Sequence, residues 1–482
     1  MNRPTASDLP LFSALEQSRN RVGFHMPGHA GGKGFASWFR EAAWSFDNTE
    51  IDILDNLNDP QGAARRSMEQ TAAIFGSAFT WYVPSGSTVG LKTAIGSVVP
   101  AGGRLLLSRV AHKSIIHALA ELSIEPLFLT DVMRDDGLLP LPLAPIDTAG
   151  YEDIDAVIVT SPDYYGRLID LKPFVRFAES LSIPLIVDAA HGAHLLVDPH
   201  LSKKSALAAG ADLVIESAHK TLAALTPGSY LHISEKALAS GRVNNERVQT
   251  ILNVYQTSSP SFPIAASLEY AAWSLEKEGR LLHRKRVAEI EQFIASLPES
   301  IGAVRGSDRD PLRLVLDLSR TKMTTRRFQA ELMHHGIDIE MADFRDLVLI
   351  VSLHQDPADF SSLLNAIEAI LHLPEDEAKA LDEAKTMAAL TSDVLLTPPS
   401  IVCSMRHALF GDVKRQLVSI EEAEGLISSS VVSPTPPCIP LLWPGEIIEK
   451  KHLTLLQNVL PEGRMLSVIV PESVSEDGRH SC

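Results

Sequence analysis

Short apolar runs alternate with amphipathic segments between residues 77 and 234. Seven runs stand out: 79–86 (FTWYVPSG), 104–109 (RLLLSR), 125–130 (EPLFLT), 155–162 (DAVIVTSP), 183–190 (IPLIVDAA), 211–217 (ADLVIES) and 229–234 (SYLHIS). Each is almost continuously apolar, which is typical of strands buried on both faces of a parallel sheet. Segments 87–99, 113–122 and 171–181 have the length and pattern of crossover helices. The pattern predicts an α/β fold with a mainly parallel central sheet between helices.

The pattern changes after residue 280. A long helix at 281–297, a strand at 312–319, a helix at 325–336 and a strand at 346–353 predict a smaller α+β domain. An acidic helix is expected at about 374–390, and the prolines of 397–400 mark a boundary. We therefore expect an N-terminal segment (1–45), a large domain (46–280), a small α+β domain (281–375), a C-terminal α/β region (376–470) and a flexible tail (471–482).

Composition and charge narrow the class of protein. The chain has 482 residues, of which 45% are hydrophobic and 21% charged, with a formal charge of -17. That charge argues against nucleic acid or an anionic membrane as the main partner. The three cysteines match no metal-ligand or redox spacing, and no apolar run reaches 18 residues. We expect a cytoplasmic protein without a metal site.

Unusual polar residues follow the predicted strands, at the edge where such sheets bind ligands. Gly86, Ser87 and Thr88 lead from the first strand into a helix, and small residues at a helix N-terminus suit a phosphate. Taken alone, Ser87 or Thr88 is better explained as a simple helix cap. His112 follows the second strand, where a single histidine is usually structural or exposed.

Asp188 and Lys220 strengthen the case for a cofactor site. Asp188 follows four apolar residues, and a buried aspartate is costly unless it meets a cation or hydrogen-bond donors. Lys220 alone would be read as a surface residue. A phosphate site, a ring-stacking histidine, an aspartate and a lysine at the strand ends of one sheet are together the residues that pyridoxal 5′-phosphate requires.

The chain resembles the Orn/Lys/Arg decarboxylase family, whose members are pyridoxal-phosphate decarboxylases of fold type I, the fold of aspartate aminotransferase. The segments that carry the resemblance occur in the family's order: 24–35 (FHMPGHAGGKGF), 48–63 (NTEIDILDNLNDPQGA), 85–92 (SGSTVGLK), 111–119 (AHKSIIHAL), 187–194 (VDAAHGAH), 216–233 (ESAHKTLAALTPGSYLHI), 257–271 (TSSPSFPIAASLEYA) and 436–446 (PPCIPLLWPGE). Together they cover most of the chain and are far more specific than any one of them.

The resemblance implies a role for each matched residue. Lys220 would bind the cofactor aldehyde, Asp188 would pair with the pyridinium nitrogen, and His112 would stack on the ring. Ala190 would lie against the other ring face, and His191 or Lys220 would return a proton to the substrate. The residues implied at the phosphate are Gly86, Ser87, Thr88, Ser217 and His219.

The N-terminal motifs imply a site built between two subunits. By resemblance, His25, His29 and Glu50 approach the active site at the interface of a homodimer or larger homo-oligomer, although a structural turn explains them equally well. Because the motif starts at Phe24, the chain resembles the short form of the family, which lacks an N-terminal wing domain.

Three departures affect the region that helps to select the substrate. Ala189 stands where short-form relatives often have glutamate, and Thr435 and Cys438 replace a tyrosine and a glycine.

The activity implied is decarboxylation of lysine, arginine or ornithine to CO2 and an amine that serves as a di- or polyamine precursor. Two alternatives stay open. Another fold type I reaction such as aminotransfer uses the same lysine and aspartate, and Arg313 in the small domain could then hold the substrate carboxylate. A catalytically idle homologue that binds the cofactor is the other alternative, because fold does not fix function.

Overall fold

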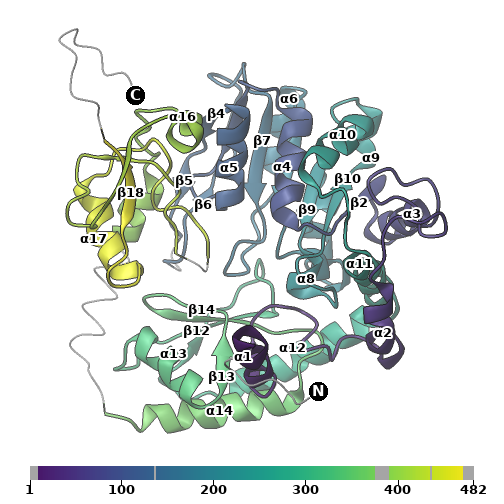
Figure 1. Cartoon of the computed structure of the whole chain (residues 1–482). Helices are drawn as coiled ribbons and strands as arrows, with labels where there is room; N and C mark the ends of the chain where they lie inside the picture. Colours follow the sequence, from purple (N-terminus) through teal and green to yellow (C-terminus); the bar gives the residue numbers. More distant parts are fainter. Residues whose placement is uncertain (1–8, 135–136, 375–389, 435–436, 471–482) are drawn as a thin grey trace.

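The computed structural model of the chain describes residues 9–134, 137–374, 390–434 and 437–470. The predicted helix at 374–390 lies outside these ranges except for its two end residues. The predicted tail at 471–482 lies wholly outside them. A central sheet occupies the upper part of Figure 1, a smaller sheet lies below it, and a third lies at its side.

The central sheet has seven strands in the order β2-β10-β9-β8-β7-β3-β4. Their bounds are β2 Phe79–Val83, β10 Ser229–Ile233, β9 Leu213–Glu216, β8 Leu185–Asp188, β7 Ala156–Thr160, β3 Arg104–Leu107 and β4 Glu125–Phe128. The strands from β9 to β4 are parallel to their neighbours, whereas β10 is antiparallel to both β9 and β2. All seven predicted runs contain a strand, and the sheet is mainly parallel as predicted.

Both faces of this sheet are buried, as the continuous apolar runs require. Along β3, Leu105 and Leu107 join the core that includes α4 and α5, whereas Leu106 joins a second core that includes Phe174 and Phe177 of α6. Successive strand residues point to opposite faces, so helices cover the sheet from both sides.

The helices of this large domain are α3 Ala63–Phe75, α4 Ser87–Val98, α5 Lys113–Leu122, α6 Lys172–Ser180, α7 Ala206–Ala209, α8 Ala218–Thr221, α9 Glu235–Ala239, α10 Asn245–Tyr255 and α11 Phe262–Ser274. A small hairpin, β5 Asp131–Val132 and β6 Leu141–Pro142, lies outside the sheet.

The region predicted as the small domain has an antiparallel sheet in the order β11-β12-β15-β14. Its strands are β11 Gly302–Ala303, β12 Arg313–Asp317, β14 Met341–Ala342 and β15 Asp346–Ile350, and its helices are α12 Arg280–Ala295, α13 Thr325–His334 and α14 Pro357–Leu371. The C-terminal region combines α16 Met405–Phe410 and α17 Lys450–Val459 with the antiparallel strands β16 Arg415–Val418, β17 Ile427–Ser428 and β18 Leu466–Ile469.

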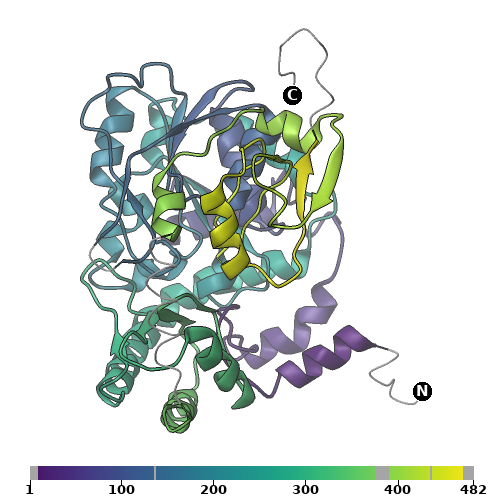
Figure 2. The same cartoon turned by 90° about the vertical axis from the view of Figure 1, so that its left-hand side faces the viewer.

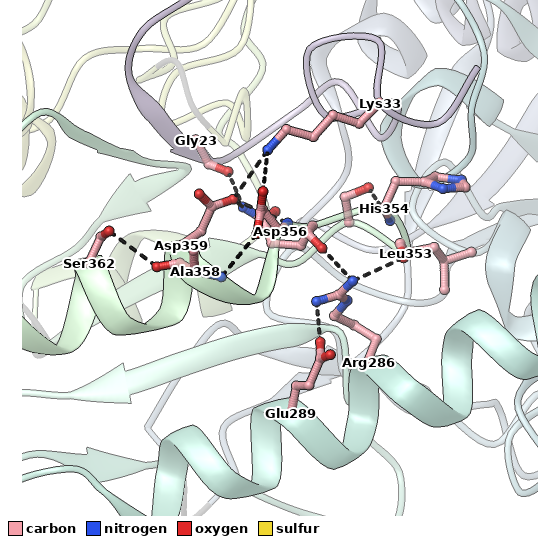
Figure 3. A network of polar contacts seen from close by, with 12 residues as sticks. Gly23, Lys33, Arg286, Glu289, Leu353, His354, Asp356, Ala358, Asp359 and Ser362 are labelled. Atoms are coloured by element: carbon pink, nitrogen blue, oxygen red, sulfur yellow. Dashed lines mark hydrogen bonds and ion pairs between the residues drawn. The ribbon is translucent and has the colours of Figure 1, made fainter. Parts of the chain in front are cut away.

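The N-terminal segment is attached to the small domain. It contains α1 Pro10–Ser18, β1 Val22–Phe24 and α2 Ser37–Ala42, and β1 pairs in parallel with β13 Ile337–Ile339. Further along, the Lys33 ammonium lies 3.6 Å from Asp356 and 3.8 Å from Asp359 at the start of α14 (Figure 3). Helix α1 buries none of its residues and projects at the side of the molecule (Figure 2). Among the described residues, no helix is long and apolar enough to span a membrane.

Candidate functional site

Three strands of the central sheet deliver candidate residues to one edge. β2 leads through Gly86 into α4, β8 ends at Asp188, and β9 leads into α8, which carries Lys220. Asp188 pairs with Ile215 of β9 across the parallel ladder. The carboxyl ends of these strands therefore meet where sheets of this class bind ligands.

The first turn of α4 and the start of α8 offer donors for an anion. Gly86 has a φ of +92°, which favours glycine, and a Cβ there would lie 3.1 Å from the Pro227 Cβ. Ser87 is half-buried and begins α4, whose first N–H groups have no partner within the helix. The Ser217 and Thr221 hydroxyls are buried and have no hydrogen-bond partner among the described residues. These donors fit a phosphate.

Two other predicted phosphate ligands fit less directly. The Thr88 side chain is exposed. His219 Nδ1 lies 3.0 Å from the Gly228 carbonyl oxygen, to which it donates. Burial lowers the pKa of His219 to about 4, and the hydrogen bond to the Gly228 carbonyl opposes part of this shift. The ring is therefore neutral near pH 7, and its Nε2 is an acceptor. A His219 bond to phosphate would need Nε2 to be protonated as well, so this role stays a prediction.

Lys220 is the end of a hydrogen-bonded chain from the small domain. Its Nζ lies 3.1 Å from His191 Nε2, and His191 Nδ1 lies 2.7 Å from Arg313 Nη2. His191 is only 6% exposed and Arg313 only 4%. Burial lowers the pKa of both Lys220 and His191, and the charge of Arg313 lowers each further, although Asp188 opposes the change at Lys220.

Asp188 is a buried carboxyl that forms no salt bridge with the described residues. It is 3% exposed, and its one described hydrogen bond comes from the Ala190 N–H at 3.1 Å. Burial raises its pKa, and the charge of Lys220 lowers it in part. A pyridinium nitrogen would supply the missing positive charge.

His112 is near enough to Lys220 for the lysine charge to act on its ring, and the Ala190 N–H is hydrogen-bonded to Asp188. His112 caps α5, and its Nδ1 accepts from the Ser114 N–H at 3.2 Å. Burial, followed by the charge of Lys220, lowers the pKa of His112 to about 3, so its ring is neutral near pH 7. Ala190 is buried at 8% exposure. A neutral ring and a small buried side chain fit the two faces of a planar cofactor.

Three residues of the site, Thr221, Tyr164 and Glu340, were not predicted from the sequence. The Tyr164 ring lies 5.2 Å from the His191 ring at 74°, and the Tyr164 hydroxyl donates to Glu340. Tyr164 follows β7, so its position after a predicted strand was an available signal. Glu340 lies between two short strands of the small domain, where no local pattern marks it.

The N-terminal candidates differ in their positions. His29 is half-buried and close to His219, and the charge of His29 lowers the pKa of His219. His29 Nδ1 accepts from the Gly32 N–H at 2.9 Å. His25 is exposed. One oxygen of Glu50 is buried without a partner in the described part of the chain. None of the described hydrogen bonds joins His25 or Glu50 to Lys220 within one subunit.

The three departures also fall in different settings. Ala189 is 2% exposed and packs in the core on the α6 side of the sheet. Cys438 adopts a φ of +62°, and its carbonyl accepts from the Lys113 N–H at 3.1 Å, next to His112. Thr435 lies outside the described residues.

Comparison with known proteins places the chain in a family. The family model described as "Orn/Lys/Arg decarboxylase, major domain" matches residues 9–305, and the model for that family's C-terminal domain matches residues 388–461. The uncharacterized protein YaaO of Bacillus subtilis is 32% identical over 94% of each chain. The arginine decarboxylase of the same species is 29% identical over 95% of this chain and 94% of that one.

A solved structure agrees with the predicted fold class. The Francisella novicida lysine decarboxylase LdcF matches with a TM-score of 0.74 at 18% identity, over 91% of this chain and 76% of that one. The fold type I architecture predicted from the sequence is thereby confirmed. The two family models together span most of the sequence, and the chain belongs to the Orn/Lys/Arg decarboxylase family.

Proposed function

We propose that this protein is a pyridoxal-phosphate-dependent decarboxylase that converts lysine, arginine or ornithine to CO2 and the corresponding amine. Its family and the name of the similar Bacillus subtilis arginine decarboxylase support this activity. The observation that carries the proposal is the buried chain of hydrogen bonds from Arg313 through His191 to Lys220.

The direction of these hydrogen bonds follows from the chemistry of the three groups. A guanidinium donates only, so Arg313 makes His191 Nδ1 an acceptor that carries no proton. A neutral imidazole then carries its single proton on Nε2, and this N–H donates a hydrogen bond to Lys220 Nζ. The lysine amine therefore accepts through its lone pair and is uncharged, which is the form that attacks an aldehyde.

The cofactor site is assigned on the same kind of reasoning. Gly86, Ser87 and Ser217 would hold the phosphate, Asp188 would meet the ring nitrogen, and the ring would lie between His112 and Ala190. When bound, pyridoxal phosphate supplies an aldehyde that joins the substrate amine and a ring that accepts the electron pair left by CO2. The buried unpartnered hydroxyls and the buried Asp188 carboxyl support this fit.

The chain's own residues then have distinct tasks. Asp188 stabilises positive charge at the ring nitrogen, which makes the ring a better electron acceptor. His191 holds a proton on Nε2 beside Lys220, so either residue is placed to return a proton to the substrate carbon. The half-buried position of Lys220 limits the water that would compete with these transfers.

Assembly and location follow from the same proposal. The N-terminal segment exposes large apolar side chains, including Phe12 at 52%, Leu15 at 56% and Trp44 at 91%. Such a surface suits burial against a second copy of the chain, as in a homodimer whose interface completes the active site with His25 and Glu50. We place the enzyme in the cytoplasm, where its amine product would enter polyamine synthesis.

The test is a substrate panel with the cofactor-loaded protein. Lysine, arginine and ornithine are incubated separately, and CO2, product amine and keto acid are measured. We expect CO2 and amine in equal amounts from at least one of them, and none from Lys220→Ala. Keto acid without CO2 would show aminotransfer instead. A protein with bound cofactor and no turnover of any amino acid would be the idle homologue.

A further inference from the structure

Two unpaired charges of opposite sign stand on either side of Tyr164. The Arg313 guanidinium carbon lies 5.8 Å from the centroid of the Tyr164 ring, and the Tyr164 hydroxyl donates to Glu340. The second Glu340 oxygen accepts from the Met26 N–H at 3.3 Å. Within the described ranges, neither Arg313 nor Glu340 forms a salt bridge. Arg313 therefore lies over the ring of Tyr164 and Glu340 lies at its hydroxyl.

Both charges lie close to Lys220. Arg313 reaches Lys220 through His191, and the Tyr164 ring packs edge-on against the same histidine. Glu340 is close enough that its negative charge acts on the Lys220 amine. Three parts of the fold therefore meet here: the loop after β7 with Tyr164, the small domain with Glu340, and the N-terminal segment with Met26.

The contacts that Glu340 makes do not explain why it is charged. An uncharged glutamine could also satisfy both partners, because its oxygen can accept from the Met26 N–H while its amide donates to the Tyr164 hydroxyl oxygen. A half-buried carboxylate without a cation is unfavourable, because it loses water without gaining a partner. Each of its oxygens retains a free acceptor position. The site therefore lacks one positively charged group, which a ligand can provide.

Arg313, in contrast, lacks hydrogen-bond acceptors among the described residues for two of its nitrogens. Its Nε and Nη1 are buried and have no hydrogen-bond partner in the described part of the chain. Nε and Nη1 point to different sides of the guanidinium, and either one can donate to a carboxylate oxygen. A molecule that carries a carboxylate at one end and a cation at the other would satisfy both residues by passing along the Tyr164 ring.

We infer that Glu340, held in place by Tyr164, binds the side-chain cation of the substrate, while the substrate carboxylate lies towards Arg313. This inference rests on the proposed function and names the residue that would select for a positive charge at the far end of the substrate side chain. Neutral side chains of equal length leave Glu340 without its cation, and acidic side chains are repelled.

Equilibrium binding of product amines isolates this contact from catalysis. Cadaverine and pentylamine share one amino group for the cofactor and differ in whether the far end is charged. Their dissociation constants are measured by calorimetry on the cofactor-loaded protein. We expect the wild type to prefer cadaverine by about ten- to a hundredfold, the range for a hydrogen bond between charged groups, and Glu340→Gln to lose that preference.

Glu340→Gln keeps the length of the side chain, and its oxygen can accept from the Met26 N–H while its amide donates to the Tyr164 hydroxyl oxygen, so we expect the fold to be retained. The matched control is Glu299→Gln, which removes one exposed negative charge from the small domain. It should leave the preference unchanged. A second measurement needs no variant: the wild type should bind lysine more tightly than norleucine, its uncharged analogue. An unchanged preference in Glu340→Gln, or equal binding of lysine and norleucine, would overturn the inference.

Failure of the inference and failure of the proposed reaction are separable. If CO2 is released from a basic amino acid but Glu340→Gln keeps the preference for cadaverine, the reaction stands and the cation site is wrong. If no amino acid yields CO2 but the preference depends on Glu340, the cation site is supported and the reaction is wrong.

Discussion

Replacing Gly28 by alanine should displace the helix that carries Lys220. A Cβ at residue 28 would lie 2.6 Å from the Thr221 carbonyl carbon and 2.8 Å from the Leu222 nitrogen, both backbone atoms. Ordinary contacts between carbon atoms are about 3.5–4.0 Å, so relief requires a shift of about 1 Å. The Gly28 N–H also donates to the His219 carbonyl at 2.8 Å, which ties the N-terminal segment directly to α8.

A 1 Å displacement of the reacting amine has a large kinetic effect. Misplacement of this size lowers reaction rates by about a hundredfold, whereas overpacking costs about 1–3 kcal/mol of folding free energy. We therefore expect Gly28→Ala to lose about two orders of magnitude in kcat and to remain folded. The assay is amine release under saturating substrate and cofactor, with a thermal melt of each sample.

The control is the same chemical change at a position with room for it. A Cβ at Gly302 meets its nearest atom at 3.4 Å, and the φ of Gly302 is not in the left-handed region. Gly302→Ala should keep both kcat and melting temperature. If Gly28→Ala retains the wild-type kcat and melting temperature, the N-terminal segment does not position α8 and the reasoning fails.

Three further predictions concern the residues around the lysine. Arg313→Met should release the fixed tautomer of His191, seen as a change in its 15N chemical shifts, and should raise the pKa of Lys220, so that cofactor capture requires higher pH. Ala190→Leu should lower the affinity for pyridoxal phosphate, measured by the visible absorbance, while the protein stays folded. His112 has a folded pKa of about 3 against an ordinary value of 6.5, so its contribution to stability is lost as pH falls through this range. His112→Asn keeps a good helix cap, and its melting temperature in the cofactor-free protein should fall less between pH 7 and pH 4.

The arrangement of the central sheet was predictable because its signal is local. A strand buried on both faces needs a nearly continuous run of apolar residues, and all seven runs became strands. The direction of β10 was not predictable from its composition, since its run resembles the others. The chain returns from β9 through the short helix α8 and the Pro227–Gly228 turn, without a long crossover, and so pairs antiparallel.

The residues of the candidate site also divide into those with a local sequence signal and those without one. Gly86, Asp188 and Lys220 could be proposed from the sequence because each stands next to a predicted strand, where position along the chain already indicates position in space. Arg313 forms its hydrogen bond with a residue 122 positions away, and Tyr164 and Glu340 are separated by 176. No spacing rule marks such pairs, because their meeting depends on how the small domain docks on the large one.

This division bears on how the activity is controlled. The residues assigned to the cofactor come from strand ends of the large domain, whereas Arg313 and Glu340, which we propose to face the substrate, come from the region predicted as the small domain. The tautomer of His191, and with it the uncharged state of Lys220, depends on Arg313 across the same boundary. A change in domain docking would therefore alter the reactivity of the lysine and the choice of substrate together, without touching the cofactor's own contacts.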